Sequence, residues 1–145
     1  MTYLGFFLAA ALAFGLGLLY IVFKGSKRGV TERLNKKVVQ QKWQEVETMM
    51  SQGGPSNFQS AVMEADKLLD YCLKSLVGTQ NNQNMSERLK MAQKKFSDRN
   101  VYQDVWSAHK VRNQLVHEVH HELNSAVARK TIEQFKKGLK NIGAL

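Results

Sequence analysis

The chain has 145 residues, of which 21 are Lys or Arg and 12 are Asp or Glu, giving a formal net charge of +9. Hydrophobic residues make up 43% of the chain, but residues 1–23 hold 19 of them and no charged side chain. This uneven distribution excludes a simple soluble globule and a multispanning membrane protein, and it predicts one membrane helix followed by a polar domain.

The first predicted element is a transmembrane helix over residues 3–23, in an anchor region of residues 1–23. Its 21 residues would span about 31 Å as a helix, close to the hydrocarbon thickness of about 30 Å. No Lys or Arg precedes the long apolar run, which favours an uncleaved anchor over a signal peptide. Small residues recur at every fourth position and can form a ridge for close helix pairing. They are Gly5, Ala9, Ala13 and Gly17.

The next region, residues 24–55, is predicted to be a basic juxtamembrane helix and linker. Residues 24–42 contain seven basic side chains and one acidic one, whereas the segment before the apolar run has no charge. The positive-inside rule predicts a single-pass protein of the plasma or inner membrane, with its N-terminus outside and its C-terminal domain in the cytoplasm. The single cysteine, Cys72, excludes an intrachain disulfide and fits a reducing compartment.

The remaining residues, 56–145, are predicted to form a cytoplasmic, antiparallel four-helix-type bundle, so the fold class of the whole chain is all-α. Apolar residues recur at three- and four-residue spacings, as amphipathic helices require. The expected helices cover residues 30–51, 57–77, 85–96, 101–117 (with a possible extension to 123) and 126–142. The breaks between them are Gly53 to Pro55, with Ser56 as an N-cap, the polar loop 79–84, a turn from Asp98 to Asn100, and Asn124 with Ser125. No strand, repeat or glycine-rich phosphate loop is evident.

The second of these helices has the clearest apolar stripe. Cys72 lies on it, so we interpret this cysteine as a buried small hydrophobic residue and not as a reactive thiol. The stripe comprises Phe58, Val62, Ala65, Leu68, Leu69, Cys72 and Leu76.

All four histidines lie in the segment VWSAHKVRNQLVHEVHHEL, residues 105–123. It contains the pattern R-N-x-x-x-H, formed by Arg112, Asn113 and His117. With the order of four helices and Trp106 upstream of the motif, the sequence resembles the HEPN superfamily of helical-bundle proteins. The resemblance covers about residues 57–142.

The resemblance implies one of two functions. Many HEPN proteins are metal-independent ribonucleases that work as dimers, with the motif lining a cleft between two subunits; others are noncatalytic nucleotide- or RNA-binding modules. Carried over to this chain, Arg112, Asn113 and His117 would form the site, the partners would be RNA or a nucleotide and a second copy of the chain, and no cofactor would be needed. A membrane anchor is not a core feature of the superfamily, which argues against a free toxin.

These residue types suit RNA cleavage. A histidine can move protons near neutral pH, an arginine can hold a phosphate with two hydrogen bonds, and Asn113, one turn before His117, can orient the imidazole or bind RNA. On an ideal helix, however, Arg112 and His117 lie about 140° apart. The two side chains therefore converge only if the helix distorts or two subunits share the site, so this hypothesis requires a homodimer. We assign His109 to the seam of the bundle.

Two alternatives stay open. His117, Glu118 and His121 satisfy the pattern H-E-x-x-H, in which two histidines bind zinc and the glutamate activates water. A zinc peptidase would also need a third protein ligand and a strand edge, and the sequence offers neither convincingly. The other alternative is a noncatalytic, membrane-tethered helical module for interaction or scaffolding.

Overall fold

The computed structural model describes residues 34–78, 83–117 and 123–145, which belong to a compact unit of residues Glu32–Leu145. These residues are all-helical and contain no strand, which confirms the predicted all-α class for this part of the chain. None of the helices within those three ranges combines the length and hydropathy needed to cross a membrane. The predicted transmembrane helix at 3–23, its ridge of small residues and its basic flank up to residue 33 lie outside the described residues.

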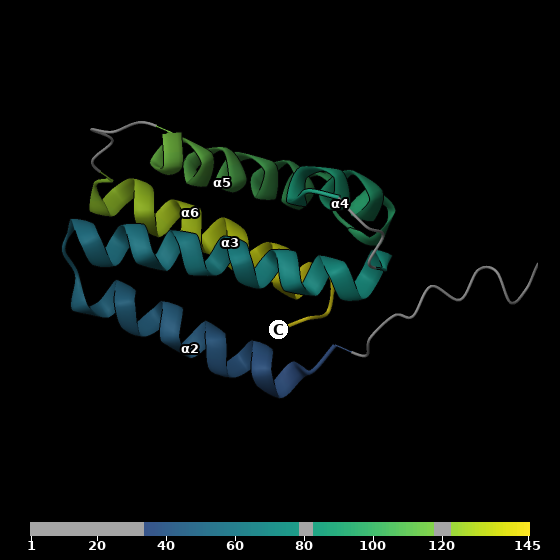
Figure 1. The fold of residues 1–145 in the computed structure, drawn as a ribbon, viewed down its shortest axis with the longest axis horizontal. Coiled ribbons are helices and arrows are strands. Elements are labelled where there is room, and N and C mark those ends of the chain that lie inside the picture. Colours follow the sequence, from purple (N-terminus) through teal and green to yellow (C-terminus); the bar gives the residue numbers. More distant parts are fainter. Residues whose placement is uncertain (1–33, 79–82, 118–122) are drawn as a thin grey trace, which may run out of the picture. The chain divides into compact units, whose positions relative to one another are not determined.

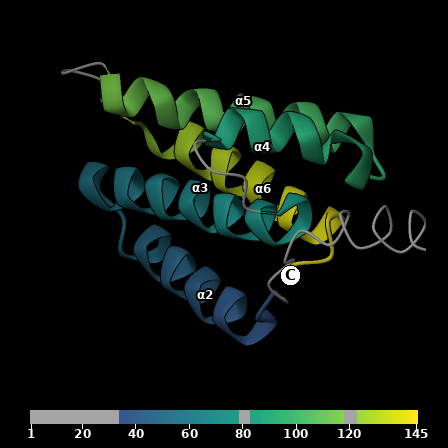
Figure 2. The same cartoon turned by 45° about the vertical axis from the view of Figure 1, so that its right-hand side comes forward.

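Five α-helices and one 3₁₀ turn form the described unit (Figure 1). They are α2 (Lys36–Gln52), α3 (Pro55–Val77), α4 (Met85–Met91), η1 (Ala92–Lys95), α5 (Arg99–His117) and α6 (Ser125–Asn141). α2 packs on α3, α3 packs on α6, and α6 packs on α5, while α4 lies against α3. Figures 1 and 2 show that α2 and α3 run in opposite directions, as do α5 and α6, whereas α3 and α6 run in the same direction.

α2 is part of the same core as the other helices. Its apolar residues recur at intervals of four, three and four, so all four lie on one face, and that face is buried. They are Val39, Trp43, Val46 and Met50. Although we grouped residues 24–55 separately from the bundle, the described part of that region packs directly on α3.

The predicted apolar stripes are the core of the structure. Every member of the α3 stripe is buried except Leu76, which is half-buried. The apolar residues expected on the shorter helix, Met85, Leu89, Ala92 and Phe96, are also buried. Helical periodicity succeeds here because it records which face of each helix is removed from water.

Several predicted helix ends differ from the structure, each for a local reason. α3 begins at Pro55 after an N-cap at Gly54, so Ser56 lies inside the helix and is not the predicted N-cap. Proline suits the first helical position because the amide hydrogen it lacks would have no intrahelical partner there. α5 begins at Arg99 because the Asp98 side chain accepts a hydrogen bond from the Asn100 backbone N–H at 2.7 Å, which caps the helix where we expected a turn.

The α-helix that starts at Met85 is shorter than predicted, ending at Met91 and continuing as the 3₁₀ turn η1. Its start is defined by a capping box, in which the Asn84 side chain accepts from the Glu87 N–H and the Glu87 side chain accepts from the Asn84 N–H. α6 starts at Ser125, with Asn124 as its N-cap, one residue before the predicted start.

One close approach holds α5 against α6. Gly138 on α6 is buried, and a Cβ atom added there would overlap Cγ2 of Val105 on α5. Val105 is β-branched and stiff, so it cannot rotate away easily. The absence of a side chain at position 138 therefore lets these two helices pack closely.

We expect Gly138→Ala to lower the free energy of unfolding by about 2 kcal/mol. Overpacking costs up to about 3 kcal/mol, while replacing a helical glycine by alanine returns about 1 kcal/mol. Urea unfolding followed by circular dichroism measures the change, with Lys137→Ala on the exposed face of α6 as the matched control. A Gly138→Ala variant at least as stable as the native chain would show that α5 and α6 are not in close contact here.

Cys72 is fully buried, and burial raises the pKa of its thiol from 9.0 to about 12. A thiol reagent at pH 8 is therefore expected to leave the folded chain unmodified and to react with one thiol per chain in denaturing urea. Because the thiol ionises more readily in the unfolded chain, its ionisation favours unfolding. The contribution of the buried, protonated thiol to the free energy of unfolding is therefore present below pH 9 and is lost as the pH rises from 9 toward 12. Modification of one thiol per folded chain at pH 8 would contradict the burial of Cys72.

Candidate functional site

A polar cavity of about 320 Å³ lies among α3, α4 and α5. Two of the three motif residues, Arg112 and Asn113, line it, and the third, His117, does not. The complete lining is Asp66, Lys67, Asp70, Asn84, Met85, Ser86, Arg88, His109, Arg112 and Asn113. The cavity brings together polar side chains that are as many as 47 positions apart in the sequence.

The periodicity of α5 explains which of its residues face the cavity. His109, Arg112 and Asn113 are three and four positions apart, so they share one face of the helix. His117 is exposed and is the last residue of α5. Because α5 stays α-helical through His117, the expected angular separation of about 140° from Arg112 persists within one subunit.

The most buried part of the site is a hydrogen-bonded pair between α3 and α5. Asp66 is 4% exposed and His109 is 5% exposed, and Nδ1 of the histidine lies 2.7 Å from Oδ1 of the carboxylate. A carboxylate oxygen is an acceptor, so Nδ1 carries a proton and donates a hydrogen bond to Asp66. In the neutral ring, Nε2 is then left as an acceptor facing the cavity lining.

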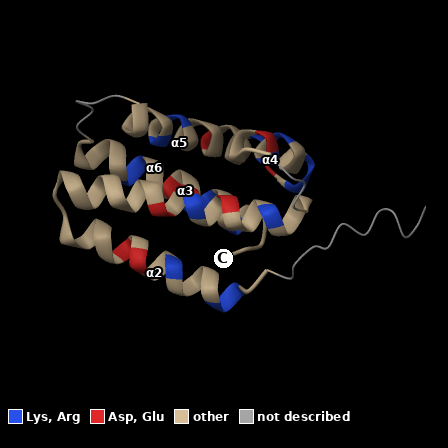
Figure 3. Cartoon of the chain, in the orientation of Figure 1, with Lys and Arg blue, Asp and Glu red and all other residues tan. Residues whose placement is uncertain are grey.

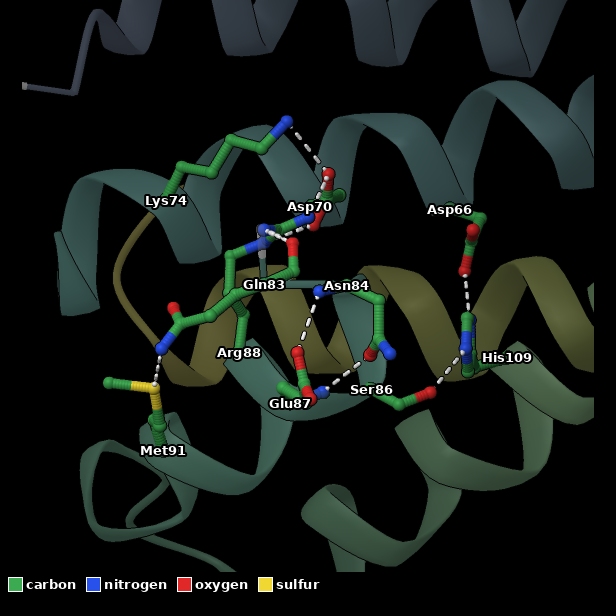
Figure 4. A network of polar contacts seen from close by, with 10 residues as sticks. All are labelled: Asp66, Asp70, Lys74, Gln83, Asn84, Ser86, Glu87, Arg88, Met91 and His109. Carbon is green, nitrogen blue, oxygen red and sulfur yellow. Dashed lines mark hydrogen bonds and ion pairs between the residues drawn. The ribbon is translucent and has the colours of Figure 1, made fainter. Parts of the chain in front are cut away.

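Two side chains meet Nε2 of His109. Ser86 Oγ on α4 lies 3.1 Å away, and Asn113 Nδ2 on α5 lies 3.2 Å away. Figure 4 shows Ser86, His109 and Asp66 following one another along a line of hydrogen bonds. Donors from α4 and α5 and an acceptor from α3 therefore fix the plane of the ring.

Arg112 lies at the edge of this network, with its side chain 27% exposed. Its Nε is 3.2 Å from Oδ2 of Asp66, as an ion pair without the alignment of a hydrogen bond. Its Nη1 donates to Oδ1 of Asn113 at 3.1 Å, which orients the amide so that Nδ2 faces His109. The guanidinium is therefore held by Asp66 and Asn113 while part of it stays accessible to solvent.

A second arginine, Arg88 on α4, is fully engaged in contacts that hold the helices together. It makes two parallel contacts with Asp70 on α3, at 2.7 Å from Nε and 3.0 Å from Nη2, and it also donates to the backbone carbonyl of Gln83. Lys74 adds a 3.0 Å ion pair to the same carboxylate. This bidentate arrangement ties α4 to α3 and forms one wall of the cavity.

The charges around the cavity favour an anionic ligand. Three cationic side chains, Lys67, Arg88 and Arg112, and two carboxylates, Asp66 and Asp70, line the cavity, and the His109 imidazole is left out of this count. The lining therefore has a formal charge of +1, and polar donors from Asn84, Ser86 and Asn113 accompany it. Figure 3 shows that acidic and basic residues lie on the same helices, including α2 and α3. The formal positive charge therefore belongs to the cavity lining and not to a whole helix.

Among the lining residues that sequence reasoning did not assign to the site are the three members of the hydrogen-bonded series, Asp66, His109 and Ser86. We assigned His109 to the seam of the bundle, and it is indeed buried there, but its second ring nitrogen contacts residues of the cavity lining. The position of Asp66 could have indicated the site, because a carboxylate inside the apolar stripe of α3 requires a buried partner. Nothing in the sequence singled out Ser86, since a serine near the start of a helix is common.

Within the described ranges, no three His, Cys, Asp or Glu side chains come together in a way that could hold a metal ion. Of the alternative zinc residues, His117 is described and exposed, whereas Glu118 and His121 lie outside the described residues. The zinc hypothesis therefore gains no further ligand from the described helices.

Comparison of the chain with family models, with curated proteins and with solved structures found no match. The resemblance to the HEPN superfamily accordingly stays a prediction from the motif and the order of helices. The function has to be inferred from the chemistry of the cavity.

The buried pairing predicts a large stability effect at Asp66. We expect Asp66→Ala to lower the free energy of unfolding by about 3–5 kcal/mol, because His109 and Arg112 both lose their carboxylate acceptor. Glu64→Ala is the matched control on α3, since among the described residues the ion pair of Glu64 is with the exposed Lys67, and a surface pair contributes at most about 1 kcal/mol. Equal losses in the two variants, measured by urea unfolding, would show that the Asp66 cluster is not buried.

Proposed function

We propose that this chain is a membrane-anchored HEPN-like module that binds a phosphate of RNA or of a nucleotide in the cavity between α3, α4 and α5. One observation carries the proposal. Arg112 and Asn113, the first two residues of the R-N-x-x-x-H motif, line the same cavity, and the guanidinium is held at its edge by Asp66.

The chemistry of the lining supports a phosphate ligand. Arg112 retains accessible N–H groups beyond those that meet Asp66 and Asn113, and an arginine presents them in a planar fork that matches two phosphate oxygens. The formal charge of +1 makes the cavity attractive to an anion without requiring a strongly basic surface. Among the described residues no Phe, Tyr or Trp lines this cavity, and the one aromatic ring in the lining, His109, is 5% exposed, so the backbone of the ligand, and not a stacked base, would supply the contacts.

Cleavage of RNA would additionally require His117. Within one subunit this side chain lies outside the cavity, at the exposed end of α5. A second copy of the chain that placed its His117 beside Arg112 would bring the phosphate-binding group and the acid–base group together. The catalytic form of the proposal is therefore a metal-independent endoribonuclease that works as a homodimer.

The anchor places this activity at a membrane. Residues 3–23 would cross the plasma or inner membrane once, with the N-terminus outside, and the basic residues that follow would stay in the cytoplasm. The helical unit would then be held at the cytoplasmic surface, where RNA and nucleotides are available.

A noncatalytic interaction module is the second candidate function. The observation that favours it is that Asp66, His109, Asn113 and Arg112 all have partners within the chain. Such a network of internal contacts can hold α3 to α5 without binding any ligand.

The test is cleavage and binding of a fluorescent RNA by the full chain, purified in mild detergent with EDTA present. We expect the native protein to cut the RNA and His117→Ala to cut it at least about 100-fold more slowly, because general acid–base catalysis contributes about 10²–10⁴-fold. His117 is exposed, so this substitution should change the free energy of unfolding by no more than about 0.5 kcal/mol.

Gln114→Ala is the matched control, because Gln114 is exposed on α5 and lies outside the cavity lining. Binding without cleavage, weakened by Arg112→Lys, would establish the noncatalytic RNA-binding form of the proposal. A folded, dimeric chain that neither binds nor cuts RNA or a nucleotide would refute the proposal and support the interaction module. Equal cleavage by the native and His117→Ala proteins would exclude His117 from catalysis.

A further inference from the structure

Three side chains from three helices form a hydrogen-bonded series at the cavity. Ser86 Oγ on α4 lies 3.1 Å from Nε2 of His109 on α5, and Nδ1 of that ring lies 2.7 Å from Oδ1 of Asp66 on α3 (Figure 4). A hydroxyl next to a base that is itself oriented by a third group is the geometric signature of an activated nucleophile. Such a site is recognised by geometry and roles, whatever the order of its residues in the chain.

We propose that Ser86 is a nucleophile and that the Ser86–His109–Asp66 series gives the cavity hydrolytic activity toward small acyl esters that carry an anionic group. This inference does not depend on RNA or nucleotide binding. It uses the same cavity, but its nucleophile and base, Ser86 and His109, are not part of the R-N-x-x-x-H motif.

The tautomer of His109 is the one that the reaction needs. Because Nδ1–H donates to Asp66, Nε2 is an acceptor and can take the proton of the Ser86 hydroxyl. Asp66 is 4% exposed and lies 2.7 Å from the ring, so its negative charge stabilises the imidazolium that forms. The carboxylate therefore positions the base and offsets the charge created when the proton moves.

Asn113 can donate a hydrogen bond to the oxyanion, the negative oxygen that forms when Ser86 attacks the ester carbonyl. Arg112 donates to its Oδ1 at 3.1 Å, which leaves Nδ2 facing His109 Nε2 at 3.2 Å. When Nε2 becomes protonated it stops being an acceptor, so the amide N–H of Asn113 is released to donate to the new negative oxygen. The amide is thus engaged in the resting site and becomes available when charge develops on the substrate.

The size and charge of the cavity define the substrate class. Ser86 is half-buried and lines the cavity, so its hydroxyl is accessible from it. A volume of about 320 Å³ is near the lower end for ligand sites and limits the substrate to a small acyl group. The partly exposed guanidinium of Arg112 would hold a carboxylate or phosphate on that substrate.

The reaction is an ordinary ester hydrolysis with water as the second reactant. Ser86 Oγ bonds to the ester carbonyl carbon as its proton passes to His109 Nε2; the bond to the alcohol oxygen then breaks, and that oxygen takes the proton. Water attacks the acyl-serine, gives one proton to Nε2, and releases the carboxylic acid as Ser86 regains its proton. One ester and one water give one acid and one alcohol, and the protein ends unchanged.

The experiment is covalent labelling of the full chain by an alkyl fluorophosphonate in mild detergent, with the modified residue located by peptide mass spectrometry. We expect the folded native chain to be labelled at Ser86 and Ser86→Ala to be unlabelled. Ser107→Ala, the matched control, should be labelled as fast as the native chain, because Ser107 is exposed on α5 and its hydroxyl donates to the Gln103 carbonyl.

Denaturing urea tests the series without any substitution in the core. Separation of Ser86 from His109 should reduce the labelling rate at Ser86 by at least about 100-fold. In the same detergent, the carboxylate-bearing ester mono-p-nitrophenyl succinate should be hydrolysed by the native chain and not by Ser86→Ala. An unlabelled folded native chain, label that persists in Ser86→Ala, or equal labelling of folded and unfolded chains would each overturn the proposal.

Discussion

The arrangement of the helices around the cavity depends on one buried charge. The carboxylate of Asp66 lies inside the apolar face of α3, where an unpaired negative charge would be far too costly to keep. Its two oxygens are met from α5, by His109 and by Arg112, and the histidine in turn meets Ser86 of α4. One charge thus specifies the relative positions of three helices, in addition to the apolar packing that holds them together.

The helices could be predicted from the sequence, but the cavity could not. Periodicity finds the buried faces of α2, α3 and α6 because each is a local pattern of Val, Leu, Phe or Met. The contact between Asp66 and His109 joins residues 43 positions apart, and that between Ser86 and His109 joins residues 23 apart. No local pattern encodes such distances, and their effect appears only once the chain is folded.

The motif illustrates the same limit. Its spacing identified Arg112 and Asn113, which the structure places at one cavity, but spacing alone gave no reason to include His109, one turn earlier on the same face of α5. Conversely His117, chosen because it completes the motif, is exposed at the end of α5 in the single chain. A helical motif identifies a face and a register, whereas the opposite wall of a site comes from other elements, here α3 and α4.

The absent side chain of Gly138 has a consequence for the cavity that α5 helps to line. Val105, which packs over that glycine, lies four residues before His109, so both side chains belong to the same row of one rigid helix. Hydrogen bonds weaken when the distance and the alignment of donor and acceptor depart from their preferred ranges. The position of His109 relative to Asp66 and Ser86 therefore depends on how closely α5 packs against α6 at Gly138, a residue that does not line the cavity.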